Sequence, residues 1–192
     1  DKNTFNKIGH SGEEQFGALS YEPGFALNPL KFVNGLASSV IEANGKIFVE
    51  SKVSSIKKND NYYIANCNSF EIKTKKIVVA TNGFYQEGLF KELDSRVMPI
   101  ISNIIVTEPL TEEQLALHNF NTFSPIVNTR NLLYYYRKLP DNRILFGARG
   151  DMDGSIVSHK KFIKKIEKNF KSVFSNWTDI KIDYSWRGLV AF

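Results

Sequence analysis

The sequence predicts a mixed α/β (α+β) fold in two parts. The first part has strands of a parallel sheet joined by a helix, and the second is a mostly antiparallel β-sheet with packed helices. Three observations support this. An amphipathic helical pattern precedes a short apolar run, a meander of short strands leads into a second apolar run, and long extended segments surround one amphipathic helix in the second half. A helix between strands is typical of a parallel crossover, whereas short strands separated by turns indicate antiparallel pairing. We expect the first part over residues 1–84 and the second over residues 85–192.

Composition excludes several classes of protein. The 192 residues are 42% hydrophobic and 13% aromatic, which is enough for a packed core. The net charge of +5 is modest, so we expect no nucleic-acid partner. The single cysteine, Cys67, and three scattered histidines predict neither a disulfide nor a metal site, and they favour a reducing, cytoplasmic location. No apolar run has the length of a membrane span.

The best marked element of the first part is a helix over residues 28–43. Residues 1–16 before it predict a loop or a short helical turn, since they are polar and punctuated by glycine. Asn28 is a good N-cap and Pro29 suits the first helical position. An apolar face at helical spacing follows, formed by Val33, Leu36, Ala37, Val40 and Ile41, and the Asn44-Gly45 pair predicts the end of the helix.

Strands follow this helix. Residues 47–49 predict a short strand, and residues 53–73 predict an antiparallel meander with Cys67 in one of its turns. Residues 76–80 form an apolar run without polar alternation, which is typical of a strand buried on both faces of a parallel sheet. Thr81, Asn82 and Gly83 follow this run. Ligands of parallel sheets bind at the carboxyl ends of the strands, and Gly83 would allow a sharp turn close to a bound group. An ordinary turn after a buried strand is the alternative.

The second half predicts antiparallel strands and one long helix. An extended run over 96–108 contains Pro99, which favours a sheet edge, and Thr111 begins a short helix. Strands over 131–139 and 142–148 predict a hairpin around Pro140-Asp141. Residues 162–174 predict an amphipathic helix with a lysine-rich outer face, and an extended run over 180–190 follows.

Several segments, taken in order, carry a resemblance to a known family. They are Gly24 to Pro29, Glu50 to Ile56, Val78 to Gly83, Tyr134 to Arg137, Asp141 to Gly147, and Trp186-Arg187-Gly188. The chain resembles the FAD-dependent amine and amino-acid oxidoreductases of the D-amino acid oxidase and glycine oxidase type, and within them the gamma-glutamylputrescine oxidoreductase branch. The resemblance implies a partial FAD-binding, Rossmann-like domain with a β-meander, joined to an antiparallel substrate domain.

The resemblance also implies a cofactor, a reaction and binding residues. FAD would contact the backbone of Val53 and the segment formed by Ala80, Thr81, Asn82 and Gly83. The reaction would be the oxidation of a carbon-nitrogen bond in a small amine or amino acid, with hydride transfer to FAD. It assigns neither a catalytic residue nor the particular amine, and it leaves open whether the enzyme is an oxidase or a dehydrogenase.

The chain departs from the family in one respect. The Gly-x-Gly-x-x-Gly turn that seats a pyrophosphate on a helix N-terminus is absent from the sequence, as is a glycine-rich segment after Val190. We therefore expect a central fragment that is truncated at its C-terminus, whose partners are the N- and C-terminal segments of the same protein. We also expect this fragment neither to retain FAD nor to be active by itself.

Substrate-binding candidates lie in the hairpin. Strand alternation places Tyr135 and Arg137 on one face and Tyr134 and Tyr136 on the other. Comparison with the family's strand favours Tyr135 as the phenol on the substrate side and Arg137 as a candidate partner for a carboxylate, and it leaves open which tyrosine of 134–136 faces the substrate. The alternative is that these tyrosines only pack the sheet.

Other side chains outside this hairpin have competing explanations. Arg149 and Arg187 are either anion ligands or ion-pair residues, and Trp186 is expected in the core. His118 and His159 are expected in exposed loops. A second hypothesis for the chain is a non-catalytic binding or interaction module that uses the basic helix over 160–174.

Overall fold

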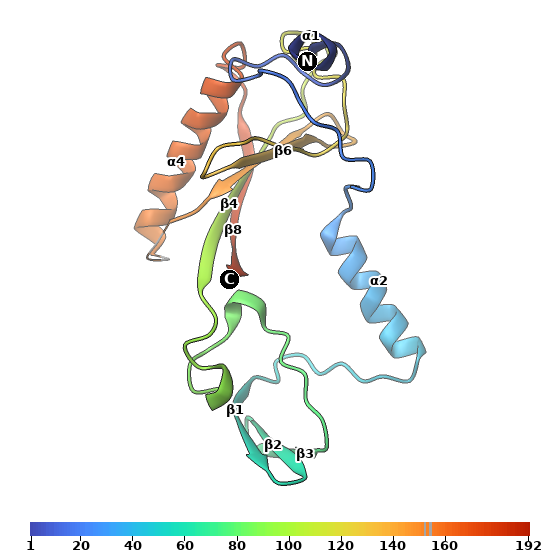
Figure 1. The fold of residues 1–192 in the computed structure, drawn as a ribbon, viewed down its shortest axis with the longest axis vertical. Helices are drawn as coiled ribbons and strands as arrows, with labels where there is room; N and C mark the ends of the chain where they lie inside the picture. The colour runs from blue at the N-terminus through green and yellow to red at the C-terminus, as the bar shows by residue number, and fades with distance from the viewer. Residues whose placement is uncertain (152, 154) are drawn as a thin grey trace. The chain divides into compact units, whose positions relative to one another are not determined.

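The computed structural model describes residues 1–151, 153 and 155–192. They form two compact units, Asp1–Ala26 with Ile100–Leu189 (the sheet unit) and Leu27–Pro99 with Val190–Phe192 (the meander unit). Both are mixtures of helices and antiparallel strands (Figure 1), as the predicted mixed α/β fold class requires. The boundary predicted at residue 84 refers to the domains of a complete enzyme and stays a prediction.

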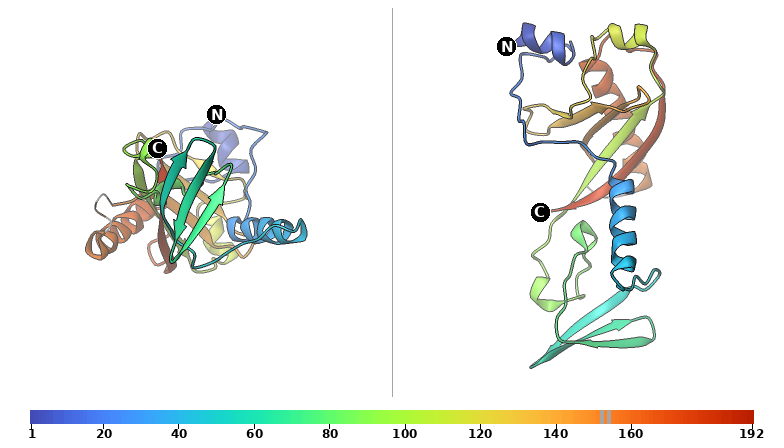
Figure 2. Two further views of the ribbon diagram at one scale, coloured as in Figure 1. Left: turned by 90° about the horizontal axis from the view of Figure 1, so that it is seen from below. Right: turned by 90° about the vertical axis from the view of Figure 1, so that its right-hand side faces the viewer.

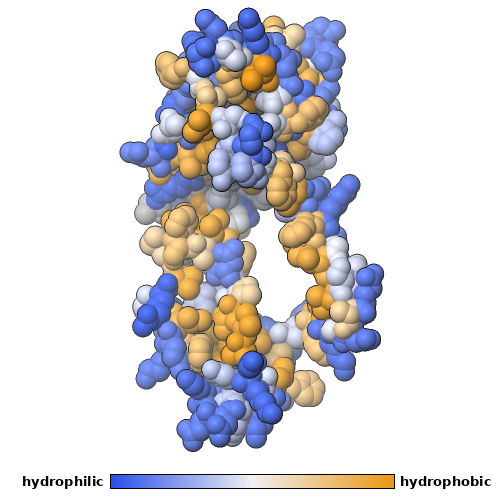
Figure 3. Space-filling view, turned by 45° about the vertical axis from the view of Figure 1, so that its right-hand side comes forward, coloured by the Kyte–Doolittle hydropathy of each residue, from blue (hydrophilic) through white to orange (hydrophobic). Residues whose placement is uncertain are grey.

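The predicted N-terminal helix of the meander unit is confirmed. Helix α2 spans Pro29–Glu42, and the side chain of Asn28 accepts a hydrogen bond from the backbone N–H of Lys31 at 3.1 Å. After the C-cap residue Ala43, Asn44 adopts a left-handed φ of 61°. None of the helix residues is buried, so the apolar face is not covered within the described residues. In Figure 3 hydrophobic residues are orange and hydrophilic residues are blue, and orange residues are visible at the surface.

The antiparallel meander is confirmed as well. Strands β1 (Val53–Asn59), β2 (Tyr62–Cys67) and β3 (Phe70–Thr74) pair in the order β1-β2-β3 (Figure 2, left). Cys67 is the last residue of β2 and pairs with both Val53 and Phe70, so its predicted place in a turn was wrong. Its side chain is buried.

Two predicted strands are not formed. Residues 47–49 and residues 76–80 belong to no helix or strand. A strand requires a ladder of hydrogen bonds to a neighbour, and the described residues provide no parallel partner to either segment. In the second segment Ile77 and Val79 pack against the core of Ile56, Ala65 and Leu89, whereas Val78 is 87% exposed. Short 3-10 helices follow at Asn82–Phe84 (η1) and Lys91–Leu93 (η2).

A five-stranded sheet forms the centre of the sheet unit. Its strands are β4 (Pro99–Thr107), β5 (Ile126–Val127), β6 (Tyr134–Lys138), β7 (Ile144–Arg149) and β8 (Ile182–Ala191), in the order β5-β6-β7-β4-β8. The β6–β7 hairpin predicted around Pro140-Asp141 is confirmed, since the two strands pair antiparallel from Tyr134↔Ala148 to Lys138↔Ile144.

In the described part of the sheet unit, three helices accompany this sheet. Helix α1 spans Lys2–Ile8, α3 spans Glu112–Ala116 and α4 spans Ile156–Val173. Thr111 and Gln114 form a capping box at the start of α3, so the helix predicted from Thr111 is confirmed. Helix α4 lies along one face of the sheet (Figure 1) and contributes to its core. That core contains Ile105, Phe120, Phe146, Ile166, Phe170, Phe174 and Trp177. Among the helices of the described residues, none combines the length and hydropathy of a membrane span.

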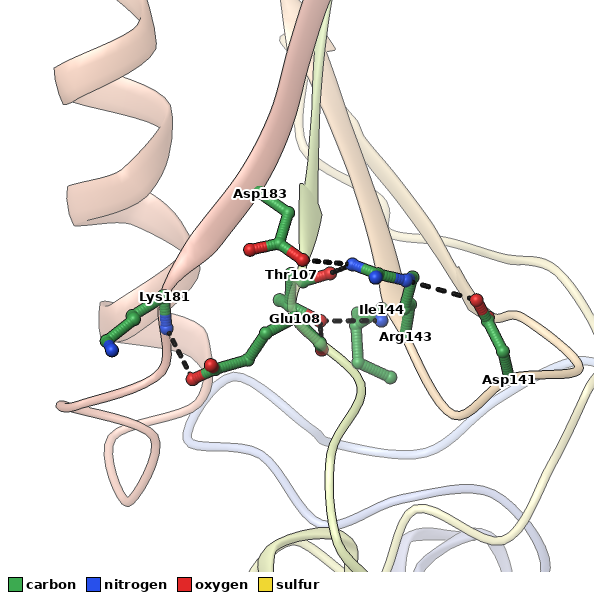
Figure 4. Close-up of polar contacts among 7 residues, drawn as sticks. All are labelled: Thr107, Glu108, Asp141, Arg143, Ile144, Lys181 and Asp183. Atoms are coloured by element: carbon green, nitrogen blue, oxygen red, sulfur yellow. Dashed lines mark hydrogen bonds and ion pairs between the residues drawn. The ribbon is translucent and has the colours of Figure 1, made fainter.

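A polar network ties together β4, β7 and β8. Figure 4 shows the Arg143 guanidinium between Asp141 and Asp183, to which it donates at 3.0 and 2.5 Å, and it also donates to the Thr107 carbonyl at 2.7 Å. The Thr107 hydroxyl accepts from the backbone N–H of Ile144 at 2.9 Å. These bonds fix the strand ends where the hairpin turns, because each strand contributes at least one partner.

Candidate functional site

The register of the sheet separates the tyrosines of β6 into two faces. Tyr136 pairs directly with Phe146, and the Tyr134 and Tyr136 rings lie 5.1 and 5.7 Å from the Phe146 ring in the core beneath α4. Because side chains alternate along a strand, Tyr135 and Arg137 lie on the opposite face. The predicted alternation is therefore confirmed, and Tyr135 is not part of the α4 core.

Tyr135 is held at two points. Its hydroxyl lies 2.7 Å from the Ser102 hydroxyl of β4, and its ring covers Gly147, the residue directly opposite on β7. A Cβ atom on Gly147 would lie only 2.1 Å from Cζ of this ring, so only glycine leaves room for it. Burial raises the pKa of Tyr135, so the phenol stays protonated near neutral pH. Ser102 was not among the predicted residues, although a Ser-Asn pair inside the apolar run of 100–106 marks a polar position.

The two arginines that were predicted as anion ligands or ion-pair residues, Arg149 and Arg187, differ in position and in partners. Arg149 is exposed and pairs across β7 and β4 with Ser102, so both side chains start from the face that carries Tyr135. Arg187 instead forms an ion pair with the buried carboxylate of Asp151 at 3.3 Å and donates to the Ser155 carbonyl at 3.2 Å. Of the two alternatives for Arg187, the structure supports ion pairing.

The residues predicted to contact FAD differ in their exposure to solvent and in their hydrogen bonds. Val53 is half-buried at the start of β1, and Ala80 and Thr81 are exposed. Asn82 has a left-handed φ of 51°, so the sharp turn predicted at Gly83 is made by Asn82. The Asn82 side-chain oxygen accepts from the backbone N–H groups of Gly83 and Ala191, both at 2.8 Å.

These contacts allow a partial fit to FAD. Ala80 and Thr81 are exposed and Val53 belongs to the edge strand β1, positions that suit contact with a large flat cofactor. The N–H of Gly83 and the amide oxygen of Asn82 are already hydrogen-bonded within the meander unit, so they hold the turn in place. Cofactor roles for all five residues stay predictions.

A pocket of about 490 Å³ lies on the other side of the sheet. Arg130, Tyr134, Phe162 and Lys165 are among its lining residues, whereas Tyr135 and Arg137 are not. Arg130 is paired with Glu14 and lies 5.1 Å from the Tyr134 ring. The pocket therefore does not include Tyr135 or Arg137, whereas the predicted anion-ligand candidate Arg149 lines it.

Three predictions about single side chains were wrong. His118 is only 3% exposed because Phe174 and Trp177 cover it, and His159 lies in α4 instead of a loop. Trp186 is 43% exposed on β8, whereas Trp177 fills the core. Ring partners distant in the sequence decide these outcomes, and a local pattern does not reveal them.

His10 is a buried residue that the sequence pattern did not single out. Its Nε2 lies 3.0 Å from the Tyr136 hydroxyl, and its ring stacks on Phe120 at 5.2 Å. Burial, assisted by the nearby His118, lowers the pKa of His10 from 6.5 to about 4. A neutral histidine thus ties the segment after α1 to the sheet core.

The exposed lysines of α4 surround an apolar face that packs on the sheet. Ile166, Phe170 and Val173 are buried, whereas the lysines of the helix are exposed. This arrangement is that of a helix with one core face and one solvated face. The hypothesis of an interaction module through this helix stays a prediction without a specific contact to support it.

Comparisons with known proteins place this geometry in a family. The DAO family profile, described as FAD dependent oxidoreductase, matches residues 7–192. The "Probable oxidoreductase OrdL" of Haemophilus influenzae is 31% identical over 166 residues, which cover 84% of this chain and 37% of that protein. The gamma-glutamylputrescine oxidoreductase of Escherichia coli is 29% identical over 175 residues, which cover 90% of this chain and 39% of that protein.

Solved structures agree on the fold. A glycine oxidase from Geobacillus kaustophilus superimposes with a TM-score of 0.63 at 14% identity, covering 82% of this chain and 40% of that chain. The chain therefore spans about two fifths of the length of each of these proteins. Because the family profile matches nearly every residue, the chain belongs to the DAO family of FAD dependent oxidoreductases.

Proposed function

We propose that the complete enzyme oxidises a carbon-nitrogen bond of a small amine or amino acid, such as a gamma-glutamylputrescine-like compound, and that this chain supplies its central part. The observation that supports the proposal most strongly is the match of residues 7–192 to an FAD dependent oxidoreductase family. The relative from Escherichia coli, named gamma-glutamylputrescine oxidoreductase, directs attention to amines of that class. A cytoplasmic location is part of the proposal, since one cysteine in 192 residues fits a reducing compartment.

In this proposal the sheet face that carries Tyr135 and Arg137 binds the substrate. The half-buried face excludes part of the solvent, and this strengthens polar contacts made there. Arg137 offers a planar, always charged fork that suits a substrate carboxylate, and the protonated Tyr135 phenol offers a polar contact beside it. FAD, when bound, supplies the acceptor for the hydride that leaves the carbon next to the amine.

We propose further that the cofactor site is completed outside this chain. Helix α2 leaves its apolar face exposed, and exposed apolar surface of this extent is typical of a contact region. Segments of the complete enzyme would cover this face and contribute the phosphate-binding turn, so the chain alone would neither retain FAD nor turn over an amine.

The test is to purify the complete enzyme and to measure its flavin absorbance and its oxidation of gamma-glutamylputrescine. Bound flavin and turnover are expected. The 192-residue chain prepared in the same way is expected to be colourless. Absence of flavin from the complete enzyme, even after added FAD, would refute the proposal, and a yellow isolated chain would refute the part that concerns the missing segments.

A substitution tests the substrate face. Tyr135→Phe is expected to raise KM or lower kcat for the amine, because it removes the phenol oxygen and keeps the ring. Tyr21→Phe is the matched control, since Tyr21 is 78% exposed outside the sheet. Equal kinetics for Tyr135→Phe and the control would remove Tyr135 from the site.

A further inference from the structure

The pocket of about 490 Å³ between the sheet and α4 is lined by charges of one sign. It lies within the sheet unit, and three of its lining residues are cationic: Arg130, Arg149 and Lys165. None of the described residues that line it is acidic. A volume of this size is typical of sites for small molecules. Because apolar walls strengthen the field of charges inside a cleft, the pocket favours an anionic ligand.

The cations of the pocket differ in their partners. Arg130 forms an ion pair with Glu14, so its charge is already compensated. Among the described residues, neither Arg149 nor Lys165 forms an ion pair. The ammonium group of Lys165 lies 5.5 Å from the centre of the Phe162 ring, which also lines the pocket. Lys165 is therefore a cation of the pocket that an external anion can pair with.

The rest of the lining combines aromatic rings with carboxamides. The rings are those of Tyr134 and Phe162, and the carboxamides are those of Asn131 and Asn169. Phe162, Lys165 and Asn169 follow one another at spacings of three and four residues, so they share one face of α4. The rings suit a flat or apolar part of a ligand, and the carboxamides suit its polar groups. This lining fits a molecule with an aromatic body and one anionic group.

Asn103 supplies a second, independent observation beside the pocket. It pairs across the strands with Ala148, which pairs in turn with Tyr134, so all three side chains lie on the face covered by α4. The Asn103 side chain is 0% exposed, and neither atom of its amide has a hydrogen-bond partner among the described residues. Native proteins leave few buried amides unpaired, so such a group points to a bound partner. Ala148, its direct neighbour, lines the pocket.

We propose that this pocket is a second ligand site, for a small aromatic anion whose carboxylate or phosphate group pairs with Lys165 and Arg149 and whose ring lies against Phe162. Both anionic groups accept hydrogen bonds from lysine and arginine. The site is additional to the proposed substrate face, since Tyr135 is not among its lining residues. It does not depend on the proposed function, because binding there requires neither flavin nor turnover.

Calorimetric titration of the complete enzyme tests the site. The probes are phenyl phosphate, phenylacetate and the uncharged benzyl alcohol. At least one anion is expected to bind, and added salt should weaken its binding, whereas benzyl alcohol should not bind. Tighter binding of phenyl phosphate would identify a phosphate ligand, and tighter binding of phenylacetate a carboxylate ligand. Binding of neither anion, or equal binding of benzyl alcohol, would overturn the proposal.

A substitution in α4 shows whether the anion binds in this pocket. Lys165→Gln should raise the Kd about tenfold, since it removes one charge-assisted hydrogen bond. Lys164→Gln is the matched control, because it removes the same charge from a neighbouring exposed residue that does not line the pocket. Equal effects of the two substitutions would overturn the proposal.

Competition separates this site from the substrate face. Saturating gamma-glutamylputrescine should leave the Kd of the anion unchanged, and complete displacement of the anion would overturn the inference. A complete enzyme that has no flavin and no turnover, yet binds the anion through Lys165, would refute the proposed function and support this second site.

Discussion

Lowering the pH from 7.5 to 4.5 should destabilise the sheet unit through His10. The side chain is 1% exposed, contacts the Tyr136 hydroxyl at 3.0 Å and lies among the rings of Phe120 and Phe174. Burial is the main reason that its pKa falls from 6.5 to about 4, because the imidazolium ion would lose its hydration there.

The sign of the effect follows from the two pKa values. At pH 7.5 the histidine is almost entirely neutral in both states, so the contribution to stability is present almost in full. As the pH falls from 6.5 to about 4, the unfolded chain binds a proton that the folded chain does not, and the free energy of unfolding decreases. The difference between the two pKa values lowers the free energy of unfolding by about 3 kcal/mol at most, at about 1.36 kcal/mol for each pKa unit. Burial lowers the pKa of His118 too, which adds in the same direction.

Urea unfolding at several pH values between 7.5 and 4.5 measures this quantity, with the fluorescence of the buried Trp177 as the signal. His10→Phe should remove most of the decrease, whereas Tyr136→Phe should keep it, because burial and not the hydroxyl is the main cause of the low pKa. Carboxylates that titrate in the same range cancel when the variants are compared with the wild type. Parallel curves for the wild type and His10→Phe would refute the reasoning.

Four further substitutions test three local arrangements by thermal unfolding. Gly147→Ala should destabilise the protein by about 1 to 3 kcal/mol, since the new methyl group collides with the Tyr135 ring; an unchanged midpoint would show that the ring moves freely. Arg143→Gln should lower the midpoint and Asp183→Asn should lower it less, because the arginine also binds a backbone carbonyl; equal effects would contradict this. Thr111→Ala should cost about 1 kcal/mol through loss of the capping box of α3, and no loss would mean that the cap is not formed in solution.

Local signals predicted the starts of α2 and α3 and the β6–β7 hairpin correctly, whereas α4 begins at Ile156, before the predicted residue 162. Asn28 and Pro29 mark the start of α2, Thr111 marks the start of α3, and Pro140-Asp141 marks the turn between β6 and β7. In each case the side chain that carries the signal also makes the local contact or sets the local backbone. The prediction failed over residues 76–80, because whether an apolar run becomes a strand depends on partners that lie elsewhere in a sheet.

In the candidate site, too, local sequence predicted some features, whereas contacts between distant residues set the others. Period-two alternation was enough to place Tyr135 and Arg137 on one face of β6, since it depends only on the strand itself. Ser102 and Gly147 could not be linked to Tyr135 in this way, because they come from β4 and β7 and meet it only through the strand register. His118 and Trp177 likewise became core residues through rings supplied by other elements.

The sequence by itself determined the class of fold, the family resemblance, the starts of α2 and α3, the meander and the two faces of β6. All of these depend on local backbone preferences or on the order of short motifs. The tertiary structure alone decided that Ser102 meets the Tyr135 hydroxyl, that Asn82 and not Gly83 makes the sharp turn, and that His10 is buried and neutral. Hydrogen bonds and burial between distant residues depend on how the strands register, and that register is set by the packing of the whole unit.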